Sequence, residues 1–287
     1  MLDTELAKKI QDFVYAKPRT IQEIAQLIKK NWRTADRYVE RITEEYGTLA
    51  TRTFREGTRG ALKIVYWQEA EKINATEFQE RLFKQIESGR KKEDFSSSEI
   101  YHYVDKSKKE AQILTEIEYS SKENFEDFEN LLKSAKQQIF FFSGNLTFSN
   151  IGWHDKKILE TIEKLAEKNI STKILTRVEI AGIENIKNIL AINNKLGKKI
   201  IEIRHCFQPL RATLIDNTIA VFKETKDPKD YAKGELKERV NILYYIYDKE
   251  WIEWLQKIFW NFFRSSISAE KRIEDIENIK GIKKLKD

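Results

Sequence analysis

The sequence lacks several features that would assign its class directly. A single cysteine, Cys206, occurs in 287 residues and cannot form an internal disulfide, so we expect a reducing, cytoplasmic location. The first ten residues, MLDTELAKKI, carry acids and lack the long apolar core of a secretory signal. No apolar run approaches the roughly 18 residues of a membrane-spanning helix, so no membrane partner is expected.

The sequence also contains no cluster of metal ligands, no glycine-rich phosphate loop and no Ser-His-Asp order. We therefore expect neither a metal nor another cofactor. Hydrophobic residues make up 40% of the chain and charged residues 34%, which is typical of a soluble globular protein, and the length suffices for two domains. The 52 Lys and Arg residues exceed the 46 Asp and Glu residues by a net charge of +6, which permits a polyanionic partner without requiring one.

The first 47 residues have the pattern of three helices. Residues 6–16 and 20–30 carry apolar side chains at helical spacing, and Thr20 and Glu23 form a capping-box pattern at the second of these segments. The two predicted helices can therefore bury their apolar faces against each other.

Residues 31–47 form the third predicted helix. Asn31 is placed to cap it and Gly47 to end it. Its apolar stripe faces the other two helices, so Arg33 and Arg37 lie on the opposite, solvent-facing side.

Residues 48–67 alternate in two β-rich runs joined by a turn that contains Gly57 and Gly60. Three short helices followed by such a hairpin resemble a winged helix-turn-helix. In that module a helix places its N-terminal side chains in the major groove of DNA, while hairpin arginines reach phosphates or the minor groove. The candidate DNA-binding residues are Trp32, Arg33, Thr34, Arg37, Arg52, Arg55 and Arg59. The alternative is a solvated charged face on a module that binds protein.

Residues 71–110 are predicted to form a helical linker. Ala75, Phe78, Leu82 and Ile86 follow one another at intervals of three and four residues and form one thin apolar seam. An isolated helix cannot bury such a seam, so it packs on a domain or pairs with its copy in a second chain. Of these two we favour the homodimer.

Residues 111–267 alternate predicted strands and helices. Strands are predicted within residues 112–119, 137–144, 170–177, 198–205, 212–222 and 241–247. Helices are predicted within residues 122–135, 155–169, 183–197 and 247–266. This order favours an α/β domain with a mixed sheet.

The segment QPLRATLIDNTIAVFKE, residues 208–224, lies before the last of these helices. It resembles the hairpin of phospholipase D-like domains, which carries an HxKxxxxD motif. Aligning Asp216 with the Asp of the motif places Arg211 at the Lys position and Pro209 at the His position. Together with the amino-terminal module, most of the chain resembles the TrmB-type archaeal transcription regulators, which join a winged helix to a phospholipase D-like domain.

The missing histidine argues against catalysis. In the active family this histidine attacks phosphorus and forms a covalent intermediate, which Pro209 cannot do. His205 precedes the proline by four residues and is not expected to replace it, so no catalytic residue is assigned. What the resemblance leaves is binding: Asn145, Arg211 and Asp216 are the candidate residues for a small anionic or sugar-like effector. The alternative is a structural ion pair between Arg211 and Asp216.

The sequence therefore predicts an α/β protein in four parts: a winged helix-turn-helix (1–70), a helical linker (71–110), a phospholipase D-like domain (111–267) and a charged tail (268–287). We expect a transcription regulator that binds double-stranded DNA as a homodimer and is not an enzyme. Two alternatives stay open. One is a phosphodiesterase or nuclease with an altered site, and the other is an architectural DNA-binding protein without a ligand.

Overall fold

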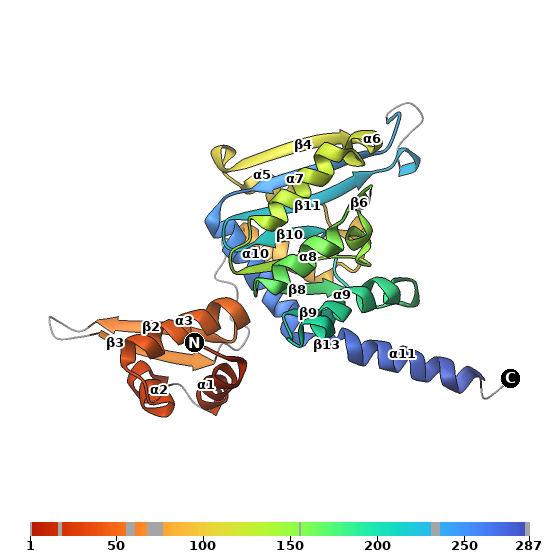
Figure 1. Cartoon of the computed structure of the whole chain (residues 1–287). Helices are drawn as coiled ribbons and strands as arrows, with labels where there is room; N and C mark the ends of the chain where they lie inside the picture. The colour runs from red at the N-terminus through yellow and green to blue at the C-terminus, as the bar shows by residue number, and fades with distance from the viewer. Residues whose placement is uncertain are drawn as a thin grey trace. The chain divides into compact units, whose positions relative to one another are not determined.

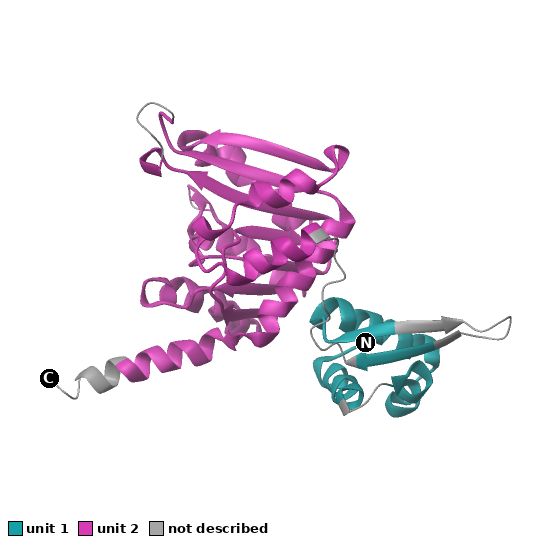
Figure 2. Cartoon of the chain, turned by 180° about the vertical axis from the view of Figure 1, so that it is seen from behind, with its two compact units in different colours: residues 1–74 teal, residues 75–287 magenta. Residues whose placement is uncertain are grey.

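The computed structural model describes residues 2–16, 19–55, 61–67, 77–154, 156–230 and 236–284. The chain forms two compact units, Met1–Asn74 and Ala75–Asp287 (Figure 2). Unit 1 has an apolar core of its own, and unit 2 is built around a large sheet.

Unit 1 contains three helices and a three-stranded antiparallel sheet with the order β1-β3-β2. The helices are α1 (Thr4–Ala16), α2 (Ile21–Ile28) and α3 (Trp32–Tyr46), and the strands are β1 (Arg19–Thr20), β2 (Leu49–Arg55) and β3 (Ala61–Trp67). The three predicted helices and the two strands of the predicted hairpin are confirmed.

The helix ends of unit 1 follow the predicted signals. The Thr20 hydroxyl accepts the Glu23 N–H at 3.1 Å, and the Glu23 carboxylate accepts the Thr20 N–H at 2.7 Å, so the capping box is confirmed. Asn31 caps α3 by accepting the Thr34 N–H at 2.9 Å, and Gly47 ends the helix at a φ of 60°. Local residues thus determine where α2 and α3 begin and where α3 ends.

Apolar side chains from all three helices and both long strands fill the core of unit 1. Fully buried members are Ile10, Ile24, Val39, Leu49 and Val65. An ion-pair cluster adds a second link between the hairpin and α3: Lys63 of β3 pairs with Asp36 and, at 3.1 Å, with Glu40. The hairpin and α3 are therefore held in one arrangement by packing and by charge.

Unit 2 is built around an eight-stranded mixed sheet with the order β13-β9-β8-β5-β10-β11-β12-β4 (Figure 1). Strands β9, β8 and β5 are parallel neighbours, and the other neighbouring pairs are antiparallel. The strands are β4 (Lys109–Thr115), β5 (Gln138–Phe142), β8 (Ser171–Thr176), β9 (Ile201–His205), β10 (Ala212–Ile215), β11 (Ile219–Lys226), β12 (Val240–Ile246) and β13 (Ile267–Ser268). The predicted α/β fold with a mixed sheet is confirmed for this unit.

The helices of unit 2 are α4 (Glu77–Ser88), α5 (Ser97–Tyr103), α6 (Glu116–Tyr119), α7 (Lys122–Lys133), α8 (Ile158–Glu167), α9 (Ile183–Leu196), α10 (Lys249–Ser265) and α11 (Ala269–Lys284). Two short strands, β6 (Gly152–Trp153) and β7 (Lys156–Lys157), pair outside the main sheet.

The central strand β5 shows how helices cover both faces of the sheet. Ile139 and Phe141 belong to the apolar core that α7, α8 and α9 share with the strands. The alternate residue Phe140 points the other way and stacks on Phe259 of α10, with 4.6 Å between ring centroids. Because it is buried on both faces, β5 is a continuous apolar run rather than an alternating one.

The described part of the predicted linker, from residue 77 on, belongs to unit 2. Leu82 and Ile86 of α4 are fully buried within the chain, whereas Phe78 is 49% exposed and stacks on Tyr103. The expected pairing of this seam with a second chain is therefore wrong for Leu82 and Ile86, whose burial is already complete. Ala75 lies outside the described residues.

Two further segments differ from expectation. Residues 112–119, predicted as one strand, divide into the end of β4 and helix α6, because Thr115 caps α6 in a capping box with Glu118. Residues 268–287, expected as a charged tail, contain helix α11. Its Ala269, with two isoleucines further along, joins the core of unit 2.

Candidate functional site

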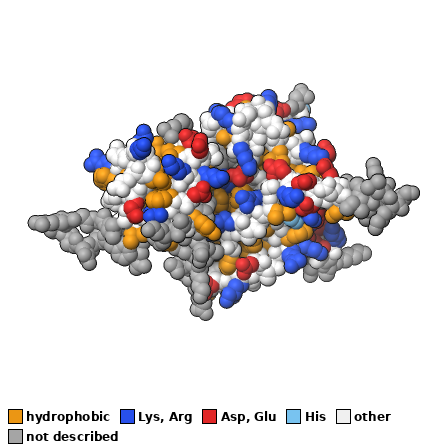
Figure 3. Space-filling view, turned by 90° about the horizontal axis from the view of Figure 1, so that it is seen from below, with side chains coloured by type: hydrophobic (Ala, Val, Ile, Leu, Met, Phe, Trp, Pro, Cys, Tyr) orange, Lys and Arg blue, Asp and Glu red, His pale blue; other side chains and the backbone are white. Residues whose placement is uncertain are grey.

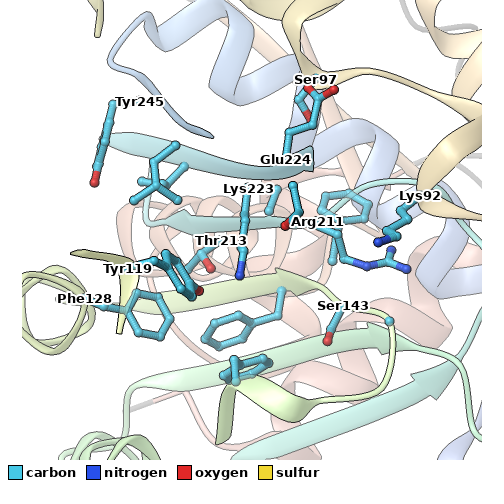
Figure 4. Close-up of a pocket in the computed structure, with 18 of the residues that line it drawn as sticks. Lys92, Ser97, Tyr119, Phe128, Ser143, Arg211, Thr213, Lys223, Glu224 and Tyr245 are labelled. Carbon is cyan, nitrogen blue, oxygen red and sulfur yellow. The ribbon is translucent and has the colours of Figure 1, made fainter. Parts of the chain in front are cut away.

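One face of the unit 2 sheet forms the floor of a cavity of about 1320 Å³ (Figure 4). Strands β5, β10, β11, β12 and β4 lie in register across this floor, and α7 lines one side of the cavity with residues that include Phe128. Pro209 and Arg211, at the His and Lys positions of the motif, both line the cavity. The cavity therefore contains the two motif positions that correspond to the catalytic His and Lys.

The Arg211 guanidinium lies against Gly144, so a side chain at position 144 would displace it. A Cβ at position 144 would lie 2.8 Å from Arg211 Nη2. Arg211 Nη1 donates to the carbonyl oxygens of Leu210, at 2.6 Å, and Gln208, at 3.4 Å. Burial, assisted by the neighbouring Arg177 guanidinium, lowers the pKa of Arg211 to about 10. Because Gly144 has no side chain, the partly buried Arg211 guanidinium can lie against its backbone.

Lys223 of β11 is a second cation in the cavity, and the sequence analysis missed it. Its backbone N–H donates to the Arg211 carbonyl at 2.8 Å, so the two residues are opposite each other and their side chains share one face. The sequence contained a signal for this pairing. A tight turn at residues 216–218 pairs Ile215 with Ile219, and extending the antiparallel register from this pair places Arg211 opposite Lys223.

The surroundings of the Lys223 amine are mainly apolar. Its Nζ lies 3.6 Å from the centroid of the Tyr119 ring. Burial lowers the pKa of Lys223 to about 8, an effect that Glu116 opposes and that Lys92 and Arg239 reinforce. A substantial fraction of this amine is therefore neutral just above physiological pH.

The structure brings two of the three ligand-binding candidates together. Asn145 and Arg211 both line the cavity, but Asp216, at a φ of 48° in the turn between β10 and β11, does not. The Asp216 carboxylate instead accepts three backbone N–H groups, from residues 136–138, at 2.8, 3.0 and 2.8 Å. Asp216 therefore fixes the beginning of β5, and the ion pair with Arg211 that we considered is not formed.

None of the three histidines, all of them within the described residues, lines the cavity. His205 Nδ1 accepts the Val178 N–H at 3.0 Å, and burial lowers the pKa of its imidazole. His102 lies on the exposed side of α5, and His154 lies beside Trp153. No histidine within the described residues takes the place of the one absent at position 209.

The DNA-binding candidates of α3 lie in its first two turns. Trp32 is 54% exposed, with the Arg33 guanidinium 5.6 Å from its ring centroid. Arg33 and Arg37 are exposed, and within the described residues neither has a carboxylate partner. Thr34 is half-buried and donates its N–H to the Asn31 cap. The first turns of α3 thus present two arginines and an indole.

The hairpin candidates are less fully described. Arg52 and Arg55 belong to β2, but their side chains lie outside the described residues, and Arg59 lies outside them altogether. On the face seen in Figure 3, Lys and Arg side chains alternate with Asp and Glu rather than forming one basic patch. This face therefore offers a polyanion no extended basic patch.

The described residues contain neither a candidate membrane-spanning helix nor a candidate metal site. No helix in the described ranges combines the length and the apolar character needed to cross a membrane. In the same ranges, no group of three or more His, Cys, Asp or Glu side chains is placed to hold a metal ion.

No protein-family model and no curated protein matches the chain. Among solved structures, TrmBL2, an archaeal chromatin protein, is similar at 14% identity and a TM-score of 0.39, over 92% of this chain and 94% of that one. Nuc from Salmonella typhimurium, a phospholipase D family member, is similar at 14% identity and a TM-score of 0.41, over 56% of this chain and 97% of that one. NucT from Helicobacter pylori is similar at 12% identity and a TM-score of 0.41, over 56% of this chain and 99% of that one.

Proposed function

We propose that this protein is a DNA-binding transcription regulator that acts as a homodimer, and that unit 2 binds an effector instead of cleaving phosphodiesters. The observation that carries the proposal is the first half of α3, where Arg33 and Arg37 are exposed and have no acidic partner among the described residues. Exposed arginines at the start of a helix are placed to meet base edges and phosphates when that end of the helix enters the major groove.

The rest of unit 1 fits a winged helix-turn-helix. Helix α3 would be the recognition helix and the β2–β3 hairpin the wing. The Lys63 cluster with Asp36 and Glu40 would keep the two at a fixed spacing, as simultaneous contact with adjacent grooves requires. Of the acidic residues of α3, Asp36 and Glu40 are paired with Lys63, and Glu44 and Glu45 lie in the last turn, where Arg41 pairs with Glu45. This arrangement favours entry of the helix by its amino-terminal end.

The proposal that unit 2 is not a phosphodiesterase rests on chemistry. Pro209 lines the cavity at the position of the histidine nucleophile, and the described lining contains no histidine. Arg211 and Asn145 can bind an anionic or sugar-like molecule there, since a guanidinium and an amide supply several hydrogen-bond donors. The altered-site nuclease is the second candidate, because the cavity contains cations that would hold a phosphate.

DNA binding by the full chain is the central test. A duplex selected from a random pool is titrated with wild-type protein and with the double variant Arg33→Ala/Arg37→Ala, and affinity is read by fluorescence anisotropy. We expect a loss of about tenfold or more, since one good base contact contributes about 1–3 kcal/mol. The matched control is Arg41→Ala, which removes a charge from the same helix at a position paired with Glu45. Equal affinities for the double variant and the wild type would remove the basis for unit 1 as a DNA reader.

The wing is tested by the salt dependence of the same titration. Variants of Arg52, Arg55 or Arg59 should each lower the slope of log affinity against log salt by about one if that residue contacts a phosphate. Slopes equal to the wild-type slope would place the hairpin away from DNA.

Catalysis and assembly need separate measurements. We expect no turnover of bis-(p-nitrophenyl) phosphate or of single-stranded DNA, and turnover that His205→Ala abolishes would favour the nuclease. Sedimentation velocity at micromolar concentration should give a dimer, and a monomer would contradict the proposed two-fold binding to half-sites. Phe78→Glu tests whether the exposed ring of α4 contributes to that dimer.

A further inference from the structure

Two cations from adjacent chain segments line the cavity of unit 2. Arg211 and Lys223 occupy opposite positions on adjacent chain segments and extend from the floor of the cavity (Figure 4). Within the described residues neither forms an ion pair with a carboxylate: Arg211 donates to backbone carbonyls, and the Lys223 amine lies over the Tyr119 ring. Burial of a charge without a counter-ion is costly, which is the reason that both pKa values are lowered. The centre of the cavity is therefore short of negative charge.

Acidic residues supply only part of that charge: Glu93 acts on Arg211 and Glu116 on Lys223, but within the described residues neither carboxylate forms an ion pair with these cations. Glu224 accepts the Ser96 hydroxyl at 2.9 Å and pairs with Lys226, and Glu93 pairs with Lys92 at 3.8 Å. Other acids line the cavity from β4 and α7, namely Glu110 and Asp127. Acids among the lining disfavour a long polyanion such as a nucleic-acid strand, because its successive phosphates would meet them. A compact ligand that places its charge only between the two cations avoids this repulsion.

The aromatic residues of the lining indicate which chemical group the rest of the ligand carries. Tyr119 and Phe128 present aromatic rings on one side of the cavity, as Figure 4 shows. The cavity, about 1320 Å³, exceeds the ~300–1,000 Å³ typical of sites for small organic molecules, so a phosphate alone would leave most of it empty. An organic group attached to the phosphate would fill the space beside the rings.

We propose that Arg211 and Lys223 together bind the phosphate group of a small organic phosphate monoester whose organic part lies against Tyr119 and Phe128. This inference rests on the proposed effector-binding role of unit 2 and names its ligand class. A monoester is favoured over a diester because it carries about two negative charges above its second pKa near 6, matching two cations, whereas a diester carries one.

Isothermal titration calorimetry of the full chain tests this inference, with phenyl phosphate as the probe. We expect a Kd below about 1 mM for phenyl phosphate at pH 7, and binding at least tenfold weaker for methyl phenyl phosphate and for phenol. Lys223→Met should weaken binding of phenyl phosphate at least tenfold, and Lys223→Arg should restore it. The matched control, Lys187→Met, removes the same charge from α9, outside the cavity lining, and should leave binding unchanged.

The pH dependence provides an independent readout. Between pH 7 and pH 9.5 phenyl phosphate stays a dianion while the Lys223 amine, with its pKa of about 8, loses its proton, so affinity should fall. The charged groups that act on this amine are Glu116, Lys92 and Arg239. In Lys223→Arg the affinity should fall much less over the same range, and the fall that remains comes from Arg211, whose pKa is about 10.

The outcomes separate this inference from the proposed function. Absence of binding by phenyl phosphate, or equal binding by wild type and Lys223→Met, would overturn the anion site even if the protein binds DNA. Equal binding of the diester and the monoester would overturn the choice of ligand class. Loss of DNA binding in Arg33→Ala/Arg37→Ala is measured without any phosphate compound, so it tests unit 1 alone.

Discussion

Replacement of Asp216 should destabilise unit 2 strongly, because its carboxylate joins two parts of the fold. It accepts N–H groups from residues 136–138 at 2.8, 3.0 and 2.8 Å, and its own N–H donates to the Gln138 carbonyl at 3.0 Å. Hydrogen bonds to a charged acceptor contribute about 1.5–3 kcal/mol each, but water can replace part of the exposed ones. For Asp216→Ala we therefore expect a loss of about 3 kcal/mol from these bonds.

Backbone conformation adds to that loss. Asp216 has a φ of 48°, a left-handed conformation that Asp and Asn adopt more readily than Ala, which costs Asp216→Ala about 1 kcal/mol more. Asp216→Asn keeps the conformation and one acceptor oxygen, so its cost should be about 1–2 kcal/mol. The expected order of stability is wild type, then Asn, then Ala.

Scanning calorimetry of the full chain measures these differences on the transition of unit 2. A loss of about 3–4 kcal/mol in a unit of this size lowers Tm by roughly 6–16 °C. Glu160→Ala, an exposed acid at the start of α8, is the control and should shift Tm by much less. If Asp216→Ala lowers the stability by less than about 0.5 kcal/mol, the carboxylate does not hold β5 in place and the reasoning fails.

Three further outcomes are expected. Gly144→Ala should leave the protein folded, since the clash is with the flexible end of Arg211, but should weaken phenyl phosphate binding in calorimetry; unchanged affinity would show that the guanidinium need not stay where it lies. Asn31→Ala should cost about 1 kcal/mol of stability in urea unfolding of unit 1 by removing the α3 cap, and no loss would contradict the capping geometry. Between pH 8 and pH 10.5 the unfolded chain binds more protons at Lys223 than the folded chain does, so this residue makes stability rise with pH. Lys223→Met should flatten that rise in urea titrations, and an equal slope in both proteins would disprove the lowered pKa.

Local signals in the sequence were sufficient for most of the fold. Caps and stops are short-range features, so Thr20, Asn31 and Gly47 could be read directly. The continuous apolar run of β5 and the alternating hairpins predicted the sheet. Residues 112–119 carried both a strand pattern and a helix-capping signal, and only the strand pattern was used. The capping box at Thr115 ends β4 and starts α6. Helix α11 was missed because its many charges hide the three- and four-residue spacing of its few buried side chains.

The candidate site was predicted less well, because its geometry depends on contacts between distant residues. A motif alignment assigned Asp216 to a ligand, but its partners at 136–138 precede it by many positions and no local pattern reveals them. Lys223 was overlooked because its role depends on the register of a hairpin rather than on its neighbours in sequence. Arg211 was found through the same motif alignment and Asn145 through the hydrogen-bonding capacity of its amide, and both line the cavity.

The strand order of unit 2 has a consequence for synthesis on the ribosome. Within the described residues β4 (109–115) pairs with β12 (240–246) alone, so this edge of the sheet cannot form until most of the chain has been made. The described core and strands of unit 1 lie within residues 2–67, so unit 1 can fold while unit 2 is still incomplete. A chain truncated before residue 240 would leave β11 with a free edge and β4 without any partner. Such edges pair with other chains, so truncated products should aggregate through unit 2 even when unit 1 is intact.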